Sequence, residues 1–188
     1  DTANRFADAA VGDVPGQFGL TPGGYYLATV HRASNSDIAE NLSEIIDAFS
    51  RLDKPVLWAI HPRTSKNIDD LGLRGRLERA TTVRPVPPVS YIETLALLQN
   101  AAALLTDSGG MQKEAYFFGI PCVTLRDETE WVETVELGWN RLAGADAARI
   151  VAAVDSIDKP SEHPPVYGDG HAANAVVACL ESRYGSTS

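Results

Sequence analysis

Residues 107–110, with the sequence Asp-Ser-Gly-Gly, have the types and spacing best suited to binding an anion. Two adjacent glycines let the backbone come close to a ligand. Apolar residues at Met111, Ala115 and Phe118 predict a helix that begins directly after this turn. The first N–H groups of that helix and its positive dipole end would point at the same place, which suits a phosphate. Paired glycines also occur in plain turns, so the pattern alone leaves both interpretations open.

Further polar side chains follow apolar runs that look like buried strands. The runs and the side chains after them are 25–30 with His31 and Arg32, 56–60 with His61 and Arg63, and 122–125 with Arg126. In an open α/β sheet, ligands bind beyond the carboxyl ends of the strands. We therefore expect these side chains to meet the 107–110 turn at one edge of a sheet.

Each of these side chains could serve a phosphorylated ligand or have an ordinary structural role. Glu114 lies about one turn into the expected helix, where its carboxylate could bind ribose hydroxyls or face solvent. An imidazole such as His31 can contact a phosphate or transfer a proton near neutral pH. Guanidinium groups clamp phosphate oxygens, so Arg32, Arg63 and Arg126 are candidates for binding a phosphate. His61 is a further candidate for ligand binding. Pro62 is expected to fix a turn that presents Arg63.

The apolar runs predict short strands buried on both faces, as in a parallel sheet. These runs are 25–30, 56–60, 82–86, 102–106, 122–125 and 140–143. Helical patterns alternate with them, from residue 37, from residue 90, from residue 111, and over 129–137, 145–154 and 170–182. Alternating strands and helices predict an α/β fold with a doubly wound, mostly parallel sheet. Another short helix is expected near residues 3–10.

Local signals predict where several helices start and stop. Asp37 with Glu40, and Ser90 with Glu93, have the spacing of capping boxes. Glycines at the ends of the patterns 111–118 and 129–137 are expected to terminate those helices.

Composition excludes several classes of function. The chain has 188 residues and a formal charge of −9 with no basic run, which argues against nucleic-acid binding. No apolar stretch is long enough to span a membrane. Its two cysteines do not form a disulfide framework, so a reduced, cytoplasmic setting is the simplest interpretation. The sequence has no metal-binding or P-loop motif, and neither a metal nor a redox cofactor is expected.

At these same residues the chain resembles the non-hydrolysing UDP-N-acetylglucosamine 2-epimerases, which have the two-domain glycosyltransferase-B architecture. The matching segments are 29–33, 61–63, 105–115, 119–122, 126–131 and 167–170. Their order and spacing resemble the second half of that family over nearly the whole chain. The resemblance implies a Rossmann-like C-terminal half in which Ser108, Gly109 and Gly110 hold the diphosphate of UDP.

The resemblance also implies the other roles and the reaction. Glu114 would bind the ribose, His31 would assist the leaving UDP, and Arg126 would border the same cleft. The sugar would be inverted at C2 by elimination of UDP and its re-addition, with no cofactor. Many family members carry a substrate-contacting Arg where Trp131 stands, so the exact sugar stays open between N-acetylglucosamine and a diacetamido-uronic acid. Ser34 stands where the family often has Glu, and because a hydroxyl cannot do the same acid–base work, Ser34 is assigned no role.

The acidic residues that move the C2 proton come largely from the first domain of this family, which leads to an expectation of a partner domain. Residues 1–24 resemble the linker, residues 25–165 the nucleotide-sugar-binding domain, and residues 166–188 the helix that crosses back to the first domain. The chain is therefore expected to bind UDP but to be inactive alone, and to form a homodimer in full-length form. The alternatives are half of a glycosyltransferase of the same architecture and a non-catalytic nucleotide-sugar-binding module.

Overall fold

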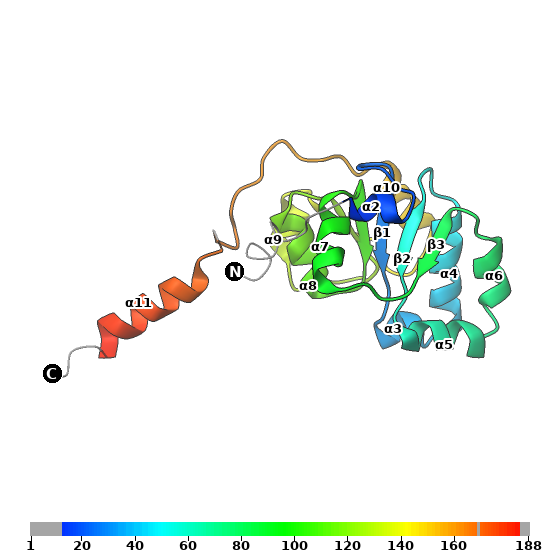
Figure 1. Ribbon diagram of the computed structural model, residues 1–188, viewed down its shortest axis with the longest axis horizontal. Coiled ribbons are helices and arrows are strands. Elements are labelled where there is room, and N and C mark those ends of the chain that lie inside the picture. Colours follow the sequence, from blue (N-terminus) through cyan, green and yellow to red (C-terminus); the bar gives the residue numbers. More distant parts are fainter. Residues whose placement is uncertain (1–12, 169, 185–188) are drawn as a thin grey trace.

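The computed structural model describes residues 13–168 and 170–184, so the helix expected near residues 3–10 lies outside the described residues. Six strands form one parallel sheet in the order β3-β2-β1-β4-β5-β6 (Figure 1). They are β1 (Tyr26–Thr29), β2 (Val56–Ala59), β3 (Val83–Val86), β4 (Ala103–Thr106), β5 (Cys122–Thr124) and β6 (Asn140–Leu142). Each strand lies inside its predicted range, which confirms the expected doubly wound α/β fold.

Helices connect the strands. They are α2 (Val14–Gln17), α3 (Ala33–Ser36), α4 (Ala39–Ser50), α5 (Pro62–Asp70), α6 (Arg74–Arg79), α7 (Tyr91–Gln99), α8 (Gly109–Phe117), α9 (Val132–Glu136), α10 (Ala147–Asp155) and α11 (Ala172–Tyr184). The helices predicted from residue 37 onward are confirmed as α4 and α7 to α11. Helices α2, α3, α5 and α6 were not predicted, because they are short or lack an apolar stripe.

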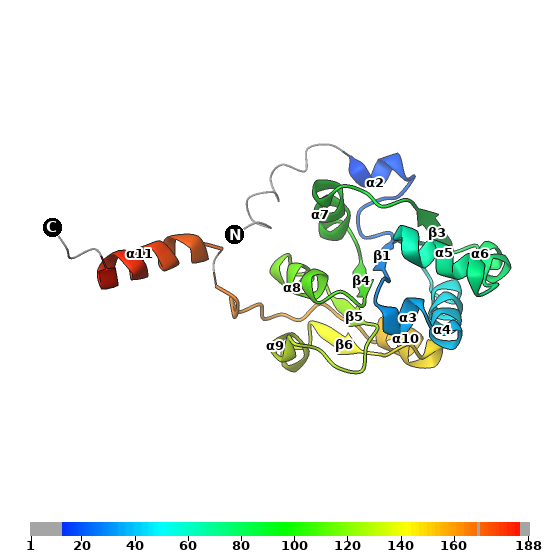
Figure 2. The same cartoon turned by 90° about the horizontal axis from the view of Figure 1, so that it is seen from below.

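Both faces of the sheet are covered, as a parallel sheet requires. Tyr26 and Ala28 of β1 pack in one apolar cluster with α4 and α10, whereas Tyr25 and Leu27 pack in another with α7 and α8. Figure 2 shows α7 and α8 on one side of the strands and α4 and α10 on the other. This alternation along β1 holds the sheet rigidly between two layers of helices.

The capping signals had mixed outcomes. Ser90 and Glu93 form the predicted capping box at the start of α7. The box predicted at Asp37 is wrong, since α4 begins after Ile38 without a side-chain cap. The Asp37 carboxylate instead accepts hydrogen bonds from Arg63 and Asn67 on α5. Tertiary partners therefore override the local pattern there.

Two turns of the fold depend on glycine or proline. Gly119 has a positive φ of 62° directly after α8, which confirms its predicted role as a helix terminator. Pro62, which was predicted to fix the turn that presents Arg63, occupies the first position of α5, and Arg63 is the next residue of that helix. The missing N–H of Pro62 carries no penalty there.

Helix α11 projects away from the sheet in Figure 1 and has no buried side chain. Its exposed apolar residues are Val176, Val177, Leu180 and Tyr184. Within the described part of the chain, no helix is long and apolar enough to cross a membrane.

Candidate functional site

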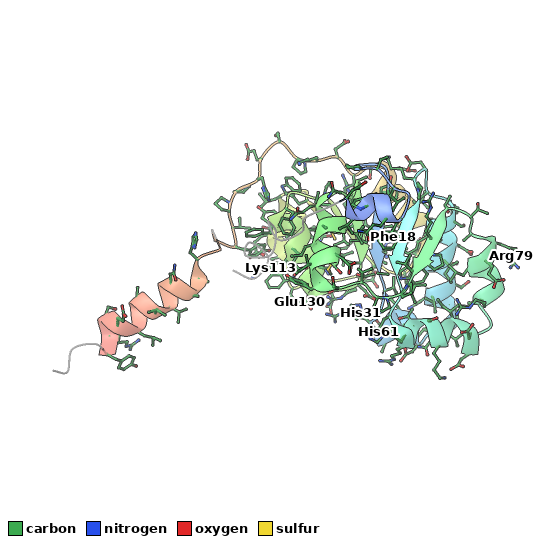
Figure 3. The ribbon with its side chains drawn as sticks, in the orientation of Figure 1. Phe18, His31, His61, Arg79, Lys113 and Glu130 are labelled. Carbon is green, nitrogen blue, oxygen red and sulfur yellow. The ribbon has the colours of Figure 1, made fainter. Side chains whose placement is uncertain are left out.

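The sheet has a topological switch point between β1 and β4. From β1 the chain moves outward through β2 and β3, and it then returns to β4 and moves outward in the other direction. Crevices at such points, beyond the carboxyl ends of the strands, are where open α/β sheets bind ligands. His31 follows β1 and residues 107–110 follow β4, so both lie at this crevice. Figure 3 shows His31, His61 and Glu130 along the same edge of the molecule.

The start of α8 presents unsatisfied N–H groups. Ser108 is the N-cap, and its hydroxyl accepts a 3.4 Å hydrogen bond from Met111 N. Gly109 and Gly110 are the first two residues of the helix, whose N–H groups have no acceptor within the helix. A Cβ added at Gly110 would meet only Ser108 Oγ, at 3.9 Å, so this residue faces open space. The start of α8 therefore has a geometry that suits an anion.

Asp107, directly after β4, fixes the position of the residues that follow β1. Its side chain is 0% exposed and accepts hydrogen bonds from the backbone N–H of His31 at 3.1 Å and of Arg32 at 3.0 Å. The Asn35 amide donates to it at 3.2 Å. Sequence reasoning assigned Asp107 no role, although a charged residue directly after a buried strand was an available signal.

The His31 ring is oriented by the same carboxylate. His31 Nδ1 lies 3.3 Å from Asp107 Oδ1, and the His31 side chain is 46% exposed. Nδ1 faces a carboxylate, which can only accept a hydrogen bond, so this contact favours the tautomer with the proton on Nδ1. Nε2 is then the ring nitrogen left for a ligand.

Arg32 and Arg126 converge on one carboxylate, that of Glu130. Arg126 binds Glu130 through two hydrogen bonds of 3.0 Å, and Arg32 Nη2 lies 3.6 Å from Glu130 Oε1. The Arg126 side chain is only 11% exposed. The structure thus brings two of the predicted arginines to the start of α8, together with an acidic residue that sequence reasoning missed.

Arg63 and His61 have different surroundings. Arg63 forms an ion pair with Asp37 and is not part of the group around Glu130. His61 is the N-cap of α5, and its Nδ1 accepts a 3.2 Å hydrogen bond from Arg63 N. His61 also lines a hollow of about 250 Å³ beside α8, with Thr29, Val30, His31, Ala59, Pro88, Val89, Thr94 and Met111.

Glu114 is a half-buried residue of α8, one turn beyond Gly110. Its Oε1 accepts a 2.7 Å hydrogen bond from the Tyr91 hydroxyl of α7. Burial raises the pKa of the Glu114 carboxyl, and the Tyr91 hydrogen bond acts in the opposite direction. Burial and this carboxylate raise the pKa of Tyr91 to about 12. Glu114 therefore presents a partly desolvated carboxylate on the same side as Gly110.

Loop 126–131 is attached to α8 by side chains other than Glu130. The Thr129 hydroxyl donates to Gln112 Oε1 at 2.5 Å and accepts from Trp131 N at 3.1 Å. Trp131 Nε1 donates to Gly109 O at 2.7 Å. Lys113 Nζ lies 4.7 Å from the centre of the Trp131 ring. These contacts fix the position of the loop relative to the start of α8.

Together, the parallel sheet and the crevice at its switch point define a Rossmann-like domain. The family model described as UDP-N-acetylglucosamine 2-epimerase matches residues 4–181, and the chain belongs to this family. The resemblance predicted from the motifs is thereby confirmed.

Two relatives have similar sequence identity to this chain, but their names give different substrates. A UDP-N-acetylglucosamine 2-epimerase homolog of Methanococcus maripaludis is 43% identical over 84% of this chain and 44% of its own length. A UDP-2,3-diacetamido-2,3-dideoxy-D-glucuronate 2-epimerase of Pseudomonas aeruginosa is 42% identical over 96% of this chain and 50% of its own length. The chain thus spans about half the length of the curated relatives it matches.

Solved structures agree with the fold. The Methanocaldococcus jannaschii UDP-GlcNAc 2-epimerase, in complex with UDP-GlcNAc and UDP, has a TM-score of 0.85 and 34% identity over 96% of this chain and 52% of its own. A calicheamicin glycosyltransferase has a TM-score of 0.59 at 18% identity, over 87% of this chain and 43% of its own, which shows a shared fold alone. The fold is that of one half of the glycosyltransferase-B architecture.

Proposed function

We propose that this chain is the UDP-binding half of an enzyme that inverts C2 of UDP-GlcNAc or a related UDP-acetamido sugar. The observation that carries the proposal is the start of α8, where open N–H groups lie beside His31 and the Arg126 guanidinium. Its place at the switch point of the sheet, in a member of this family, supports a nucleotide-sugar ligand.

The binding mode follows from the order of groups along α8. The N–H groups of Gly109 and Gly110 and the Ser108 cap receive the diphosphate, and Arg32 and Arg126 neutralise it. Glu114, one turn further along, binds the ribose hydroxyls. The adjoining hollow then holds the uracil ring, with His61 on its wall. Arg63 contributes only if it leaves Asp37.

The reaction requires the removal of a proton from C2 of the sugar. The C2–H electron pair forms the C1–C2 double bond, and the C1–O bond breaks with its electron pair moving to UDP. His31 Nε2, held in place by Asp107, interacts with the departing phosphate oxygen. Return of a proton to the opposite face of C2 and re-addition of UDP at C1 complete the inversion. Neither step is a net oxidation, so no redox cofactor is required.

The base that removes the proton belongs to a second domain under this proposal. General-base catalysis needs a carboxylate within hydrogen-bond reach of the proton, and the relatives are about twice as long as this chain. Residues 1–24 then serve as linker, 25–165 as the nucleotide-sugar-binding domain and 166–188 as the segment that packs on the second domain. The exposed apolar side chains of α11 support that packing. A cytoplasmic homodimer completes the proposed assembly.

Two measurements test the proposal. Calorimetric titration of the chain should show saturable binding of UDP, and an assay of C2 epimerisation with UDP-GlcNAc should show little or no turnover. Absence of UDP binding at about millimolar concentration in a folded sample contradicts the ligand assignment. Robust turnover by the chain alone contradicts the assignment of the base to another domain. An acceptor-dependent sugar transfer would identify a glycosyltransferase instead.

The sugar itself is best tested by competition. Trp131 occupies the position where many family members carry a substrate-contacting Arg, and one relative acts, by its name, on a diacetamido-glucuronate. We expect this chain to bind either UDP-GlcNAc or the UDP-diacetamido-glucuronate more tightly than UDP-glucose, which lacks the acetamido group. Equal affinity for all three would contradict recognition of an acetamido sugar.

A further inference from the structure

The carboxylate of Glu130 lies where the proposed function places the diphosphate. A Cβ built on Gly109 would lie 3.2 Å from Glu130 Oε2, so this oxygen is at the first turn of α8. Glu130 also binds Arg126 through both oxygens and lies 3.6 Å from Arg32. Both guanidinium groups and the positive end of the helix therefore face a negative charge that belongs to the protein itself.

The Glu130 side chain can leave without dismantling the loop that carries it. Loop 126–131 is held to α8 through the Thr129 hydroxyl and through Trp131 Nε1, and Trp131 N bonds to Thr129 within the loop. Glu130 itself is 51% exposed, whereas its partner Arg126 is 11% exposed. The carboxylate is thus the partner with access to solvent, and the guanidinium is the one enclosed by protein.

We propose that Glu130 is an internal counter-anion that occupies the diphosphate position in the unliganded protein and is displaced by the ligand. This inference rests on the proposed function and adds that the Glu130 carboxylate competes with the diphosphate for the same site. While the site is empty, Glu130 keeps Arg126 and Arg32 aligned toward the start of α8. When a diphosphate arrives, it takes over the hydrogen bonds of Arg126, and like-charge repulsion drives the Glu130 carboxylate outward.

The inference predicts an unusual sign for one substitution. Most substitutions in a binding site lower the affinity for the ligand. Glu130→Gln, in contrast, removes a competing charge while it keeps nearly the same side-chain shape. UDP should therefore bind Glu130→Gln about tenfold tighter than the wild-type chain, a typical size for coupling between two sites. Inorganic pyrophosphate should show the same gain, because the competition concerns the diphosphate and not the nucleoside.

The control is Glu128→Gln, which removes an exposed carboxylate two residues earlier in the same loop. It changes the net charge equally, so its affinity for UDP should stay within about twofold of wild type. Thermal unfolding establishes that all three proteins are folded before titration. Tighter binding by Glu130→Gln alone supports the inference.

Two other results are distinguishable. If the wild-type chain binds UDP and Glu130→Gln binds it equally or more weakly, Glu130 is a ligand-supporting residue and the inference is overturned, while the proposed function stands. If none of the folded proteins binds UDP or pyrophosphate at about millimolar concentration, the proposed function fails and the inference falls with it.

Discussion

Gly110 is the residue at which stability and ligand binding should respond in opposite directions to one substitution. It is the second residue of α8, and its φ is not positive, so alanine fits the backbone there. An added Cβ would have Ser108 Oγ as its nearest neighbour, at 3.9 Å, which is ordinary contact. Gly110→Ala therefore introduces no clash in the unliganded protein.

The expected magnitudes follow from that geometry. Replacing a compatible glycine by alanine stabilises a protein by about 0.4–1 kcal/mol, mainly by restricting the unfolded chain. For a chain of this size, that corresponds to a rise in Tm of about 1–4 °C. The same methyl group would stand beside the N–H that receives the phosphate. Disturbing one such hydrogen bond, at about 1.4 kcal/mol, weakens UDP binding about tenfold.

Gly75→Ala is the matched control, because Gly75 is the exposed second residue of α6 and does not line the crevice. Differential scanning calorimetry should show a similar gain in Tm for both variants, and titration should show weaker UDP binding only for Gly110→Ala. Gly110→Leu should lose still more affinity, about a hundredfold. The reasoning is refuted if Gly110→Ala binds UDP like Gly75→Ala, or if it is less stable than the wild-type chain.

Other substitutions test the surroundings of the site. Asp107→Asn should lower the free energy of unfolding by about 1–3 kcal/mol, because an amide cannot accept from every donor that Asp107 now satisfies, and an unchanged urea midpoint would contradict this. Burial raises the pKa of Glu114, so the stability of the wild-type chain should fall as the pH rises from the ordinary carboxyl range through the folded pKa. Glu114→Gln should remove that pH-dependent loss and weaken UDP binding, and a urea midpoint that varies with pH as in the wild-type chain would count against it. Leu105→Ala, in the buried centre of β4, should destabilise the fold by about 3 kcal/mol in the same assay, and a loss under about 1 kcal/mol would show that the sheet is not packed as described.

The strands were predictable because the signal that identifies them is local. The inner strands β1, β2, β4 and β5 are apolar runs that are largely buried on both faces, whereas the edge strands β3 and β6 expose Arg84 and Arg141. Helix α5 escaped prediction because its sequence, PRTSKNIDD, has no apolar stripe. Its start depends on Pro62 and on the His61 side chain, which act as a cap. The capping box predicted at Asp37 is wrong because the Asp37 side chain binds residues that lie 26 and 30 positions further along the chain.

The site was predictable to the extent that it consists of strand ends. His31, Arg126 and the Gly109–Gly110 pair follow strands directly, so the topology alone brings them to one edge. The partners of these residues could not be predicted, because they depend on how loops fold back. Glu130 reaches Arg126 only through an irregular loop, and Asp107 reaches His31 from a strand 76 residues later in the chain.

The proposed function depends most on the binding of the diphosphate by the first N–H groups of α8. Amide NMR spectra recorded during a UDP titration test this directly, because glycine amide signals are well separated from others. We expect the Gly109 and Gly110 amide signals to move with UDP concentration along one binding curve, and the Gly75 signal of α6 to stay in place. If UDP binds while the Gly109 and Gly110 signals remain unchanged, the diphosphate lies elsewhere and the proposed binding mode is wrong.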